Sequence, residues 1–321
     1  MKRVIAVIII LLMISMALPG CEAAIGKPLG EGGRIDADKN GMKIYTSFYP
    51  MYFLVSEIAG DKAEVISMVP AGAEPHDWEP TPRLAVELND ADMLVYNGAG
   101  MEVWIDNILS IIDRDKTKVV DASEGIELLK AEEHSEEEHE EESREHGLYD
   151  PHIWVSPLRL KQQAQTVYEA LKEADPENSG YYEKNMTELV SKLTKLDKDI
   201  RDASKYFRSN IIVVSHEAFG YFANDYGFKQ VAIRGVNPQE EPSPSKMAEL
   251  AIECKENDVR YIFFEKLTSP KLSETLAREV GAEVLVLNDA AGLNEEDIKS
   301  GRDYISVMYE NIENLKKALG D

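Results

Sequence analysis

The sequence predicts an α/β protein with two lobes, each a mostly parallel sheet flanked by helices, joined by one long backbone helix. Short apolar segments of strand length alternate with helical segments between Met42 and Asp121, and a second series of the same kind begins at Asn210. This alternation is typical of parallel sheets whose two faces are covered by helices. Residues 176–208 lie between the two series and are helical in composition. The chain of 321 residues is long enough for two domains of ordinary size.

The first lobe is expected to span residues 42–175. Its strands should be the short apolar segments Lys43–Ser47, Glu64–Met68, Asp92–Tyr96 and Lys118–Asp121. The helices between them are expected at Met51–Ala59, Arg83–Leu88 and Val103–Ile111. A lobe of this composition buries a sheet between two layers of helices.

The second lobe is expected to span residues 209–321 and to repeat the alternation. Strands are predicted at Ile211–Ser215, Gln230–Ile233, Arg260–Glu265 and Glu283–Leu287. Helices are predicted at Phe219–Tyr226, Lys246–Glu256 and Lys271–Val280, with a closing helix at Asp303–Ala318. The second series therefore predicts a separate parallel sheet.

The linking segment, residues 176–208, carries one apolar stripe at helical spacing, formed by Leu189, Leu193, Leu196 and Ile200. A single helix here would be about 45 Å long at 1.5 Å per residue, enough to run along both lobes. The alternative is two helices with a break near Ser179 and Gly180. A single rigid connector would resist wide opening of the lobes.

The N-terminus predicts export. Lys2 and Arg3 precede the apolar run Val4–Leu18, which is short for a membrane span and typical of a signal sequence. Residues 18–21, Leu-Pro-Gly-Cys, resemble a lipobox, so Cys21 is the predicted lipidation site; Pro19 is uncommon in such a motif. The alternative is an uncleaved anchor. In both cases residues 1–21 attach the protein to the outer face of the cell membrane, in the periplasm or at the cell surface, and residues 22–41 form a flexible tether.

Charge narrows the classes of ligand. The formal net charge of -24 repels nucleic acids and anionic lipids and favours a cationic ligand. Part of the negative charge lies in residues 131–147, which are nearly all Glu and His, and which we expect to form a solvated, disordered loop. Its histidines, His134, His139 and His146, form either a weak accessory collector of Zn²⁺ or part of a passive linker.

The other three of the six histidines lie in turn-rich motifs. His76 follows the second predicted strand, His152 precedes a helix, and His216 follows the first strand of the second lobe. Asp289 follows the last strand. Ligands of open α/β sheets bind at the carboxyl ends of strands, so these four side chains can meet in one cleft. A lone histidine at a strand end is usually structural, but three imidazoles and a carboxylate form a tetrahedral site that suits Zn²⁺.

These motifs resemble those of the metal-binding receptors of zinc and manganese ABC importers. The resemblance runs from about Met42 to the C-terminus and is carried by GAEPHDWEP, DPHIWVSP, VVSHEAFGYF and NDAAG, with NGAGMEVW and EPSPS. It implies two α/β lobes, a long connecting helix and one metal ion between the lobes. It further implies that the metal ligands are His76, His152, His216 and Asp289, and that this protein passes the metal to an ABC permease. We expect the protein to be a monomer.

The metal is expected to be Zn²⁺, with Mn²⁺ as the alternative. Manganese receptors of this family tend to have a carboxylate where His216 stands, and imidazole suits zinc better. Zinc receptors of the family also often carry a His-rich loop before the second histidine motif, although this loop is richer in Glu. Because zinc binds neutral imidazole, we expect zinc affinity to fall as the pH drops through about 6.5.

Two other classes of function use the same residues. In a secreted zinc hydrolase the three histidines would leave a coordination position for water, and Glu74 or Glu217 would be the base. The sequence contains no HExxH motif, and the tether and two-lobe pattern favour a receptor, so we expect no enzymatic activity. A metal-binding adhesin or metallochaperone of the same fold would have the same site.

Overall fold

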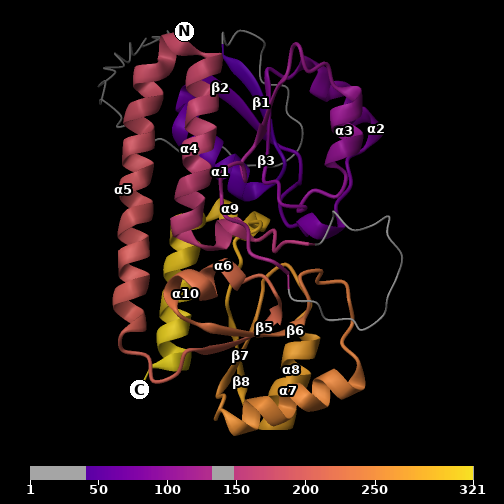
Figure 1. Cartoon of the computed structure of the whole chain (residues 1–321), viewed down its shortest axis with the longest axis vertical. Coiled ribbons are helices and arrows are strands. Elements are labelled where there is room, and N and C mark those ends of the chain that lie inside the picture. The colour runs from indigo at the N-terminus through magenta and orange to yellow at the C-terminus, as the bar shows by residue number, and fades with distance from the viewer. Residues whose placement is uncertain (1–40, 132–147, 321) are drawn as a thin grey trace, which may run out of the picture.

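The computed structural model describes residues 41–131 and 148–320 (Figure 1). Two lobes lie one above the other along the long axis of the molecule, and a long helix runs beside both. The sheet of the first lobe has the order β2-β1-β3-β4 and is parallel throughout. Its strands are β1 (Met42–Thr46), β2 (Ala63–Ser67), β3 (Met93–Tyr96) and β4 (Lys118–Asp121). The predicted parallel sheet is confirmed.

Helices cover both faces of this sheet. Side chains alternate between the two faces along each strand, so neighbouring residues of one strand belong to different cores. Ile44 and Val95 belong to a core with α1 (Tyr49–Ala59) and α4 (Pro157–Ala174), whereas Tyr45 and Leu94 belong to a second core with α3 (Ile105–Ile111). The short helix α2 (Pro82–Glu87) lies on the same side as α3 (Figure 1).

The second lobe contains two pairs of parallel strands. β5 (Ile211–His216) pairs with β6 (Lys229–Arg234), β7 (Tyr261–Phe264) pairs with β8 (Glu283–Val286), and β5 lies beside β7. The helices are α6 (Gly220–Tyr226), α7 (Pro244–Glu256), α8 (Lys271–Val280), α9 (Glu295–Lys299) and α10 (Tyr304–Leu319). One face of these strands packs on α7 and α8, and the other joins the core of the first lobe. The two-lobed α/β fold is therefore as predicted.

The long helix α5 spans Ser179–Ser204 and follows a 3-10 turn at Pro176–Asn178. Its 26 residues extend about 39 Å, and it packs on α1 and α4 above and on α10 below. The predicted apolar stripe is buried. The helix ends four residues before the predicted Arg208, whose amide instead donates to the Leu319 carbonyl (2.9 Å). The domain boundaries at residues 175/176 and 208/209 remain predictions.

Several predicted features lie outside the described residues. These are the signal or anchor segment 1–21 with Cys21, nearly all of the tether, and His134, His139 and His146. Within residues 41–131 and 148–320, each helix is too short or too polar to cross a membrane.

Candidate metal centre

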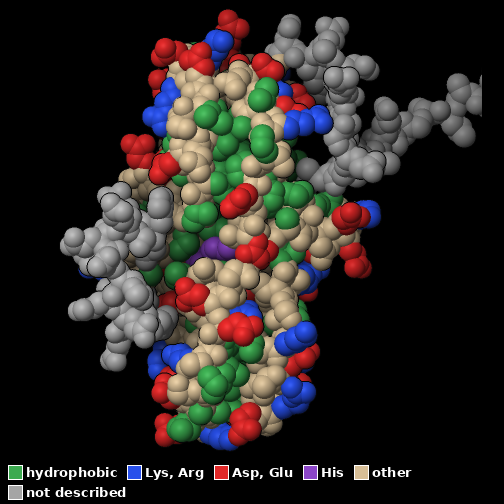
Figure 2. All heavy atoms as spheres, turned by 90° about the vertical axis from the view of Figure 1, so that its right-hand side faces the viewer, with side chains coloured by type: hydrophobic (Ala, Val, Ile, Leu, Met, Phe, Trp, Pro, Cys, Tyr) green, Lys and Arg blue, Asp and Glu red, His purple; other side chains and the backbone are tan. Residues whose placement is uncertain are grey.

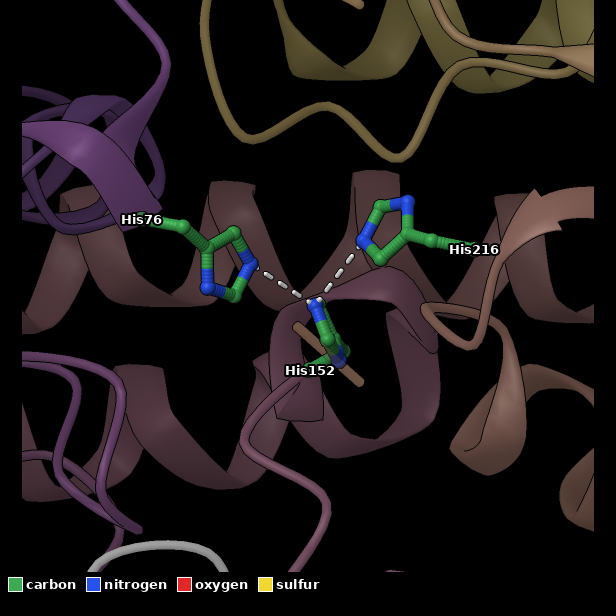
Figure 3. A group of neighbouring side chains, drawn as sticks. All are labelled: His76, His152 and His216. Atoms are coloured by element: carbon green, nitrogen blue, oxygen red, sulfur yellow. Dashed lines mark hydrogen bonds between the residues drawn. The ribbon is translucent and has the colours of Figure 1, made fainter. Parts of the chain in front are cut away.

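Three histidines from distant parts of the chain meet between the lobes (Figure 3). His76 lies in a 3-10 turn after β2, His152 directly precedes the 3-10 turn Ile153–Val155, and His216 is the last residue of β5. His152 Nε2 lies 3.1 Å from His76 Nε2 and 3.3 Å from His216 Nε2. One nitrogen from each of the three rings lies within 4.8 Å of the others. The structure thus brings these three imidazoles together, and their role as metal ligands remains a prediction.

The spacing of the nitrogens fits one small cation. Zn–N bonds are about 2.0–2.1 Å long, so two nitrogens on a tetrahedral zinc ion are about 3.3–3.4 Å apart. The two Nε2–Nε2 distances, 3.1 and 3.3 Å, are close to this value. Three lone pairs that face one point repel one another unless a cation or a proton lies between them. The geometry can therefore hold Zn²⁺ with little rearrangement.

Buried carboxylates fix the orientation of two of the rings. His152 Nδ1 donates to Asp150 Oδ1 (2.8 Å), and His216 Nδ1 donates to Glu265 Oε2 (2.9 Å). Because a carboxylate only accepts hydrogen bonds, each Nδ1 carries a proton, and Nε2 is the nitrogen that can bind a metal once it is itself deprotonated. We did not predict these partners from the sequence. Glu265 follows β7 directly, so the strand-end pattern that indicated Asp289 also applied to Glu265.

Burial and charge act in opposite directions on the histidines. Burial and the neighbouring imidazoles hold the pKa values of His76 and His152 well below the usual value. Burial also lowers the pKa of His216, but the charge and hydrogen bond of Glu265 outweigh it and raise that pKa to about 9. His216 is therefore the imidazole that binds a proton most strongly.

Asp289 lies beside the histidines. Among the described residues, the group whose ligand atoms all lie within 4.8 Å of one another contains the three histidines without Asp289. Asp289 is nevertheless buried, and its backbone carbonyl accepts a hydrogen bond from Trp154 Nε1 (2.8 Å). Burial, followed by the charges of Glu265 and Glu74, raises the pKa of its carboxyl to about 7. The Asp289 carboxyl is thus close enough to influence the charge of His216, but it must lose any bound proton before it can bind a metal.

The site opens at the boundary between the lobes. His152 and His216 are buried and His76 is half-buried. In Figure 2 histidine is visible at this boundary, with acidic side chains around it. A cation entering here meets a negative field and nitrogen ligands.

The loop after β3 supports the segment that bears His152. Asn97 Nδ2 donates to the Pro151 carbonyl (2.9 Å), and the buried Glu102 carboxylate accepts from the amides of Asn97 (2.8 Å) and Gly98 (3.1 Å). Gly98 has φ +81°, and a Cβ there would lie 2.0 Å from Asp121 Oδ1. The loop therefore requires glycine at this position.

Three tryptophans lie in the loop motifs of the first lobe, and one of them packs on a histidine of the site. Trp154 and Trp104 are buried, and Trp78 packs edge to face on Trp104 with ring centroids 5.3 Å apart. The Trp154 ring also lies 5.3 Å from the His152 ring. Packing against the Trp154 ring limits the movement of the His152 ring.

Comparison with known proteins agrees with this geometry. Residues 44–318 match the family model described as "Zinc-uptake complex component A periplasmic" (ZnuA). The chain is 40% identical over 301 residues to the high-affinity zinc uptake system protein ZnuA of Bacillus subtilis, covering 92% of this chain and 93% of that protein. It is 38% identical over 277 residues to the zinc-binding lipoprotein AdcA of Streptococcus pneumoniae, covering 86% of this chain but 55% of AdcA.

The fold has a counterpart among solved structures. The Zn(II)-bound ZnuA-like domain of Streptococcus pneumoniae AdcA superposes with a TM-score of 0.75 at 36% identity, covering 88% of this chain and 100% of that domain. This chain thus spans about half of the streptococcal relative and nearly the whole of the Bacillus relative. Because the family model matches most of the chain, the protein belongs to the family of periplasmic zinc-uptake complex component A proteins.

Proposed function

We propose that this protein is the extracytoplasmic receptor of an ABC importer, that it captures Zn²⁺ between its lobes, and that it delivers the ion to a membrane permease. His76, His152 and His216 are the proposed nitrogen ligands, with Asp289 as the fourth ligand. The observation that carries the proposal is the convergence of three Nε2 atoms at distances close to those on a tetrahedral zinc ion.

Zinc is the proposed cargo in preference to manganese. The proposed ligands are three imidazole nitrogens and one carboxylate, whereas Mn²⁺ favours oxygen ligands and a higher coordination number. The zinc-related names of the relatives support the same choice. Family membership supports a receptor rather than a zinc hydrolase.

Attachment and accessory binding are separate parts of the proposal. Cys21 carries a lipid that tethers the receptor to the outer face of the membrane, and the name of the lipoprotein AdcA supports this attachment. His134, His139 and His146 bind further zinc ions weakly and act as an accessory collector of zinc. Release requires docking on the permease, with Asp289 as the ligand that leaves first.

Zinc titration in the presence of a competing chelator tests the site. The wild-type protein should bind one zinc ion tightly, and His152→Ala should lose that binding because His152 lies between the other two histidines. Glu87→Gln, which changes a partly exposed carboxylate paired with Arg83 on α2, is the control. Tight binding retained by the His152→Ala variant would contradict the ligand assignment.

A transport assay tests the receptor role. ABC permease and ATPase from the same organism, reconstituted in proteoliposomes, should take up zinc only when the receptor is added. Manganese uptake under the same conditions would favour the alternative cargo. Uptake that was independent of the receptor would contradict the role.

A further inference from the structure

The turn that carries Asp289 has an uncommon backbone conformation. Ala290, the next residue, has φ +58°, in the left-handed region that residues with a Cβ rarely adopt. Both Asp289 and Ala290 are buried. Such a conformation persists only where the surrounding structure holds it in place.

Two side chains from other elements hold this turn. Asn311 on α10 accepts a hydrogen bond from the Asn288 amide (2.8 Å) and donates to the Asn288 carbonyl (2.6 Å). Trp154 Nε1 donates to the Asp289 carbonyl (2.8 Å). Asn311 belongs to the same lobe as the turn, whereas Trp154 belongs to the segment that follows His152. The hydrogen bond from Trp154 therefore joins the Asp289 turn of the second lobe to the segment of the first lobe that bears His152.

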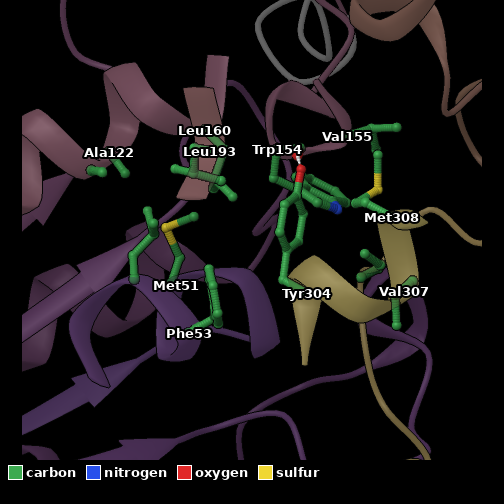
Figure 4. Packing of buried hydrophobic residues seen from close by; sticks show 14 of the residues in the cluster. Met51, Phe53, Ala122, Trp154, Val155, Leu160, Leu193, Tyr304, Val307 and Met308 are labelled. Atoms are coloured by element: carbon green, nitrogen blue, oxygen red, sulfur yellow. Dashed lines mark hydrogen bonds between the residues drawn. The ribbon is translucent and has the colours of Figure 1, made fainter. Parts of the chain in front are cut away.

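The indole of Trp154 is itself fixed in position. The side chain is fully buried, and Phe48 packs against it edge to face with ring centroids 4.8 Å apart. Tyr304 of α10 donates its hydroxyl to the Trp154 carbonyl (2.8 Å), as Figure 4 shows. Trp154 is thus held by residues of both lobes and has little freedom to follow the Asp289 turn if that turn moves.

We propose that Trp154 is a positioning residue for zinc binding, which acts by holding the backbone of Asp289 at a fixed place relative to His152. This inference rests on the proposed function. Without the Nε1–H donor, the buried Asp289 carbonyl loses its partner and the left-handed turn relaxes. The carboxylate then spends less time beside the three histidines, and zinc binding weakens although each ligand is still present.

Trp154→Phe keeps an aromatic ring on Phe48 and removes the donor, so this variant tests the inference. We expect zinc affinity to fall about tenfold, the effect of one buried hydrogen bond. Asp289→Ala removes the carboxylate itself. If Trp154 acts through Asp289, the double variant should bind zinc no more weakly than Asp289→Ala alone, because the two changes remove the same interaction.

Cobalt provides a readout that a purely structural role would not change. The visible absorption of bound Co²⁺ depends on its coordination, so the Trp154→Phe variant should give a spectrum shifted toward that of Asp289→Ala. Tyr182→Phe is the matched control, because it removes the hydrogen bond of another fully buried aromatic side chain, that to Asp175 (2.6 Å), away from the histidines. It should leave both zinc affinity and the cobalt spectrum unchanged.

The outcomes separate the two proposals. Wild-type protein that bound no zinc would overturn the proposed function. Wild-type binding with unchanged affinity in Trp154→Phe would overturn the positioning role alone, and so would losses that simply add in the double variant.

Discussion

Glu265 Oε2 lies 2.9 Å from His216 Nδ1, and both side chains are buried at the carboxyl ends of β5 and β7. Thr268 Oγ1 donates to the same carboxylate oxygen (3.3 Å). Burial acts to raise the pKa of Glu265, but the positive charge and hydrogen bond of His216 hold it below the usual value. The pair is therefore an imidazolium and a carboxylate until a metal displaces the proton on Nε2.

Glu265→Gln should weaken zinc binding about tenfold or more, because a ligand-supporting carboxylate makes the imidazole a stronger donor. The dissociation constant, measured by chelator competition, checks this. Glu253→Gln, a partly exposed carboxylate paired with Lys229 (2.8 Å), is the control. An unchanged dissociation constant in Glu265→Gln would show that the hydrogen bond to His216 does not support binding.

Zinc binding should release about one proton near pH 7.5, because the pKa of His216 is raised to about 9 while zinc needs its neutral form. Titration calorimetry in buffers of different ionisation enthalpy measures this number. Affinity should rise about tenfold per pH unit up to pH 9 and fall more steeply below pH 7, where Asp289 also binds a proton. On acidification, zinc affinity should thus begin to fall at a pH above about 6.5, the pKa of an ordinary histidine. Affinity independent of pH between 7 and 9 would contradict this.

Removing residues 132–147 and joining Ala131 to Leu148 through Asn-Gly should leave the tight site intact and remove only weaker zinc equivalents. The flanking chains already pair, since Ala131 N donates to Leu148 O (3.2 Å) and Asp150 N donates to Leu129 O (2.9 Å). An Asn-Gly turn closes such a pair. Binding stoichiometry by calorimetry distinguishes the two classes of site. Loss of the tight site would mean that these residues contribute a ligand.

Arg159→Ala should lower the free energy of unfolding by about 3 kcal/mol, because it leaves a largely buried carboxylate without its cation. Arg159 of α4 makes two hydrogen bonds of 2.9 Å to Asp225 of α6, so this ion pair joins the lobes. Urea denaturation measures the change. Lys198→Ala, which breaks the solvent-exposed pair with Asp202, should lower the free energy of unfolding far less, because water screens that pair. Equal losses in the two variants would contradict the argument.

The sequence indicated the strands and the three histidines because both depend on local patterns. Apolar alternation located each strand, and the strand-end rule placed His76 and His216 at the carboxyl ends of strands in the two lobes, facing one cleft. The same rule gave the chain position of Asp289 but not its exact placement, which depends on Trp154 and on a left-handed residue. Helix α5 ends at Ser204, before Arg208, because the Arg208 amide pairs with the Leu319 carbonyl, a tertiary contact that helical composition cannot reveal.

The orientation of the imidazoles depends on contacts between distant segments. His216 and Glu265 are 49 residues apart, and their pairing follows from the neighbouring positions of β5 and β7. Spacing along the chain contains no information about which two strands are neighbours. Asp150 is a different case, since it stands two residues before His152 and could have been found from the motif alone.

The core continues without interruption from the α1–α4–α5 layer into β5, β7 and α10, and Met51, Trp154 and Tyr304 all belong to it (Figure 4). Swinging the lobes apart would expose this apolar interior to water at about 25 cal/mol for each Å². Exchange of the ion with its surroundings should therefore depend on small local displacements of the ligands, while the body of the molecule stays closed. We therefore expect such a receptor to present nearly the same surface to the permease with and without zinc. The permease must then distinguish the two states by the residues around the opening of the metal site.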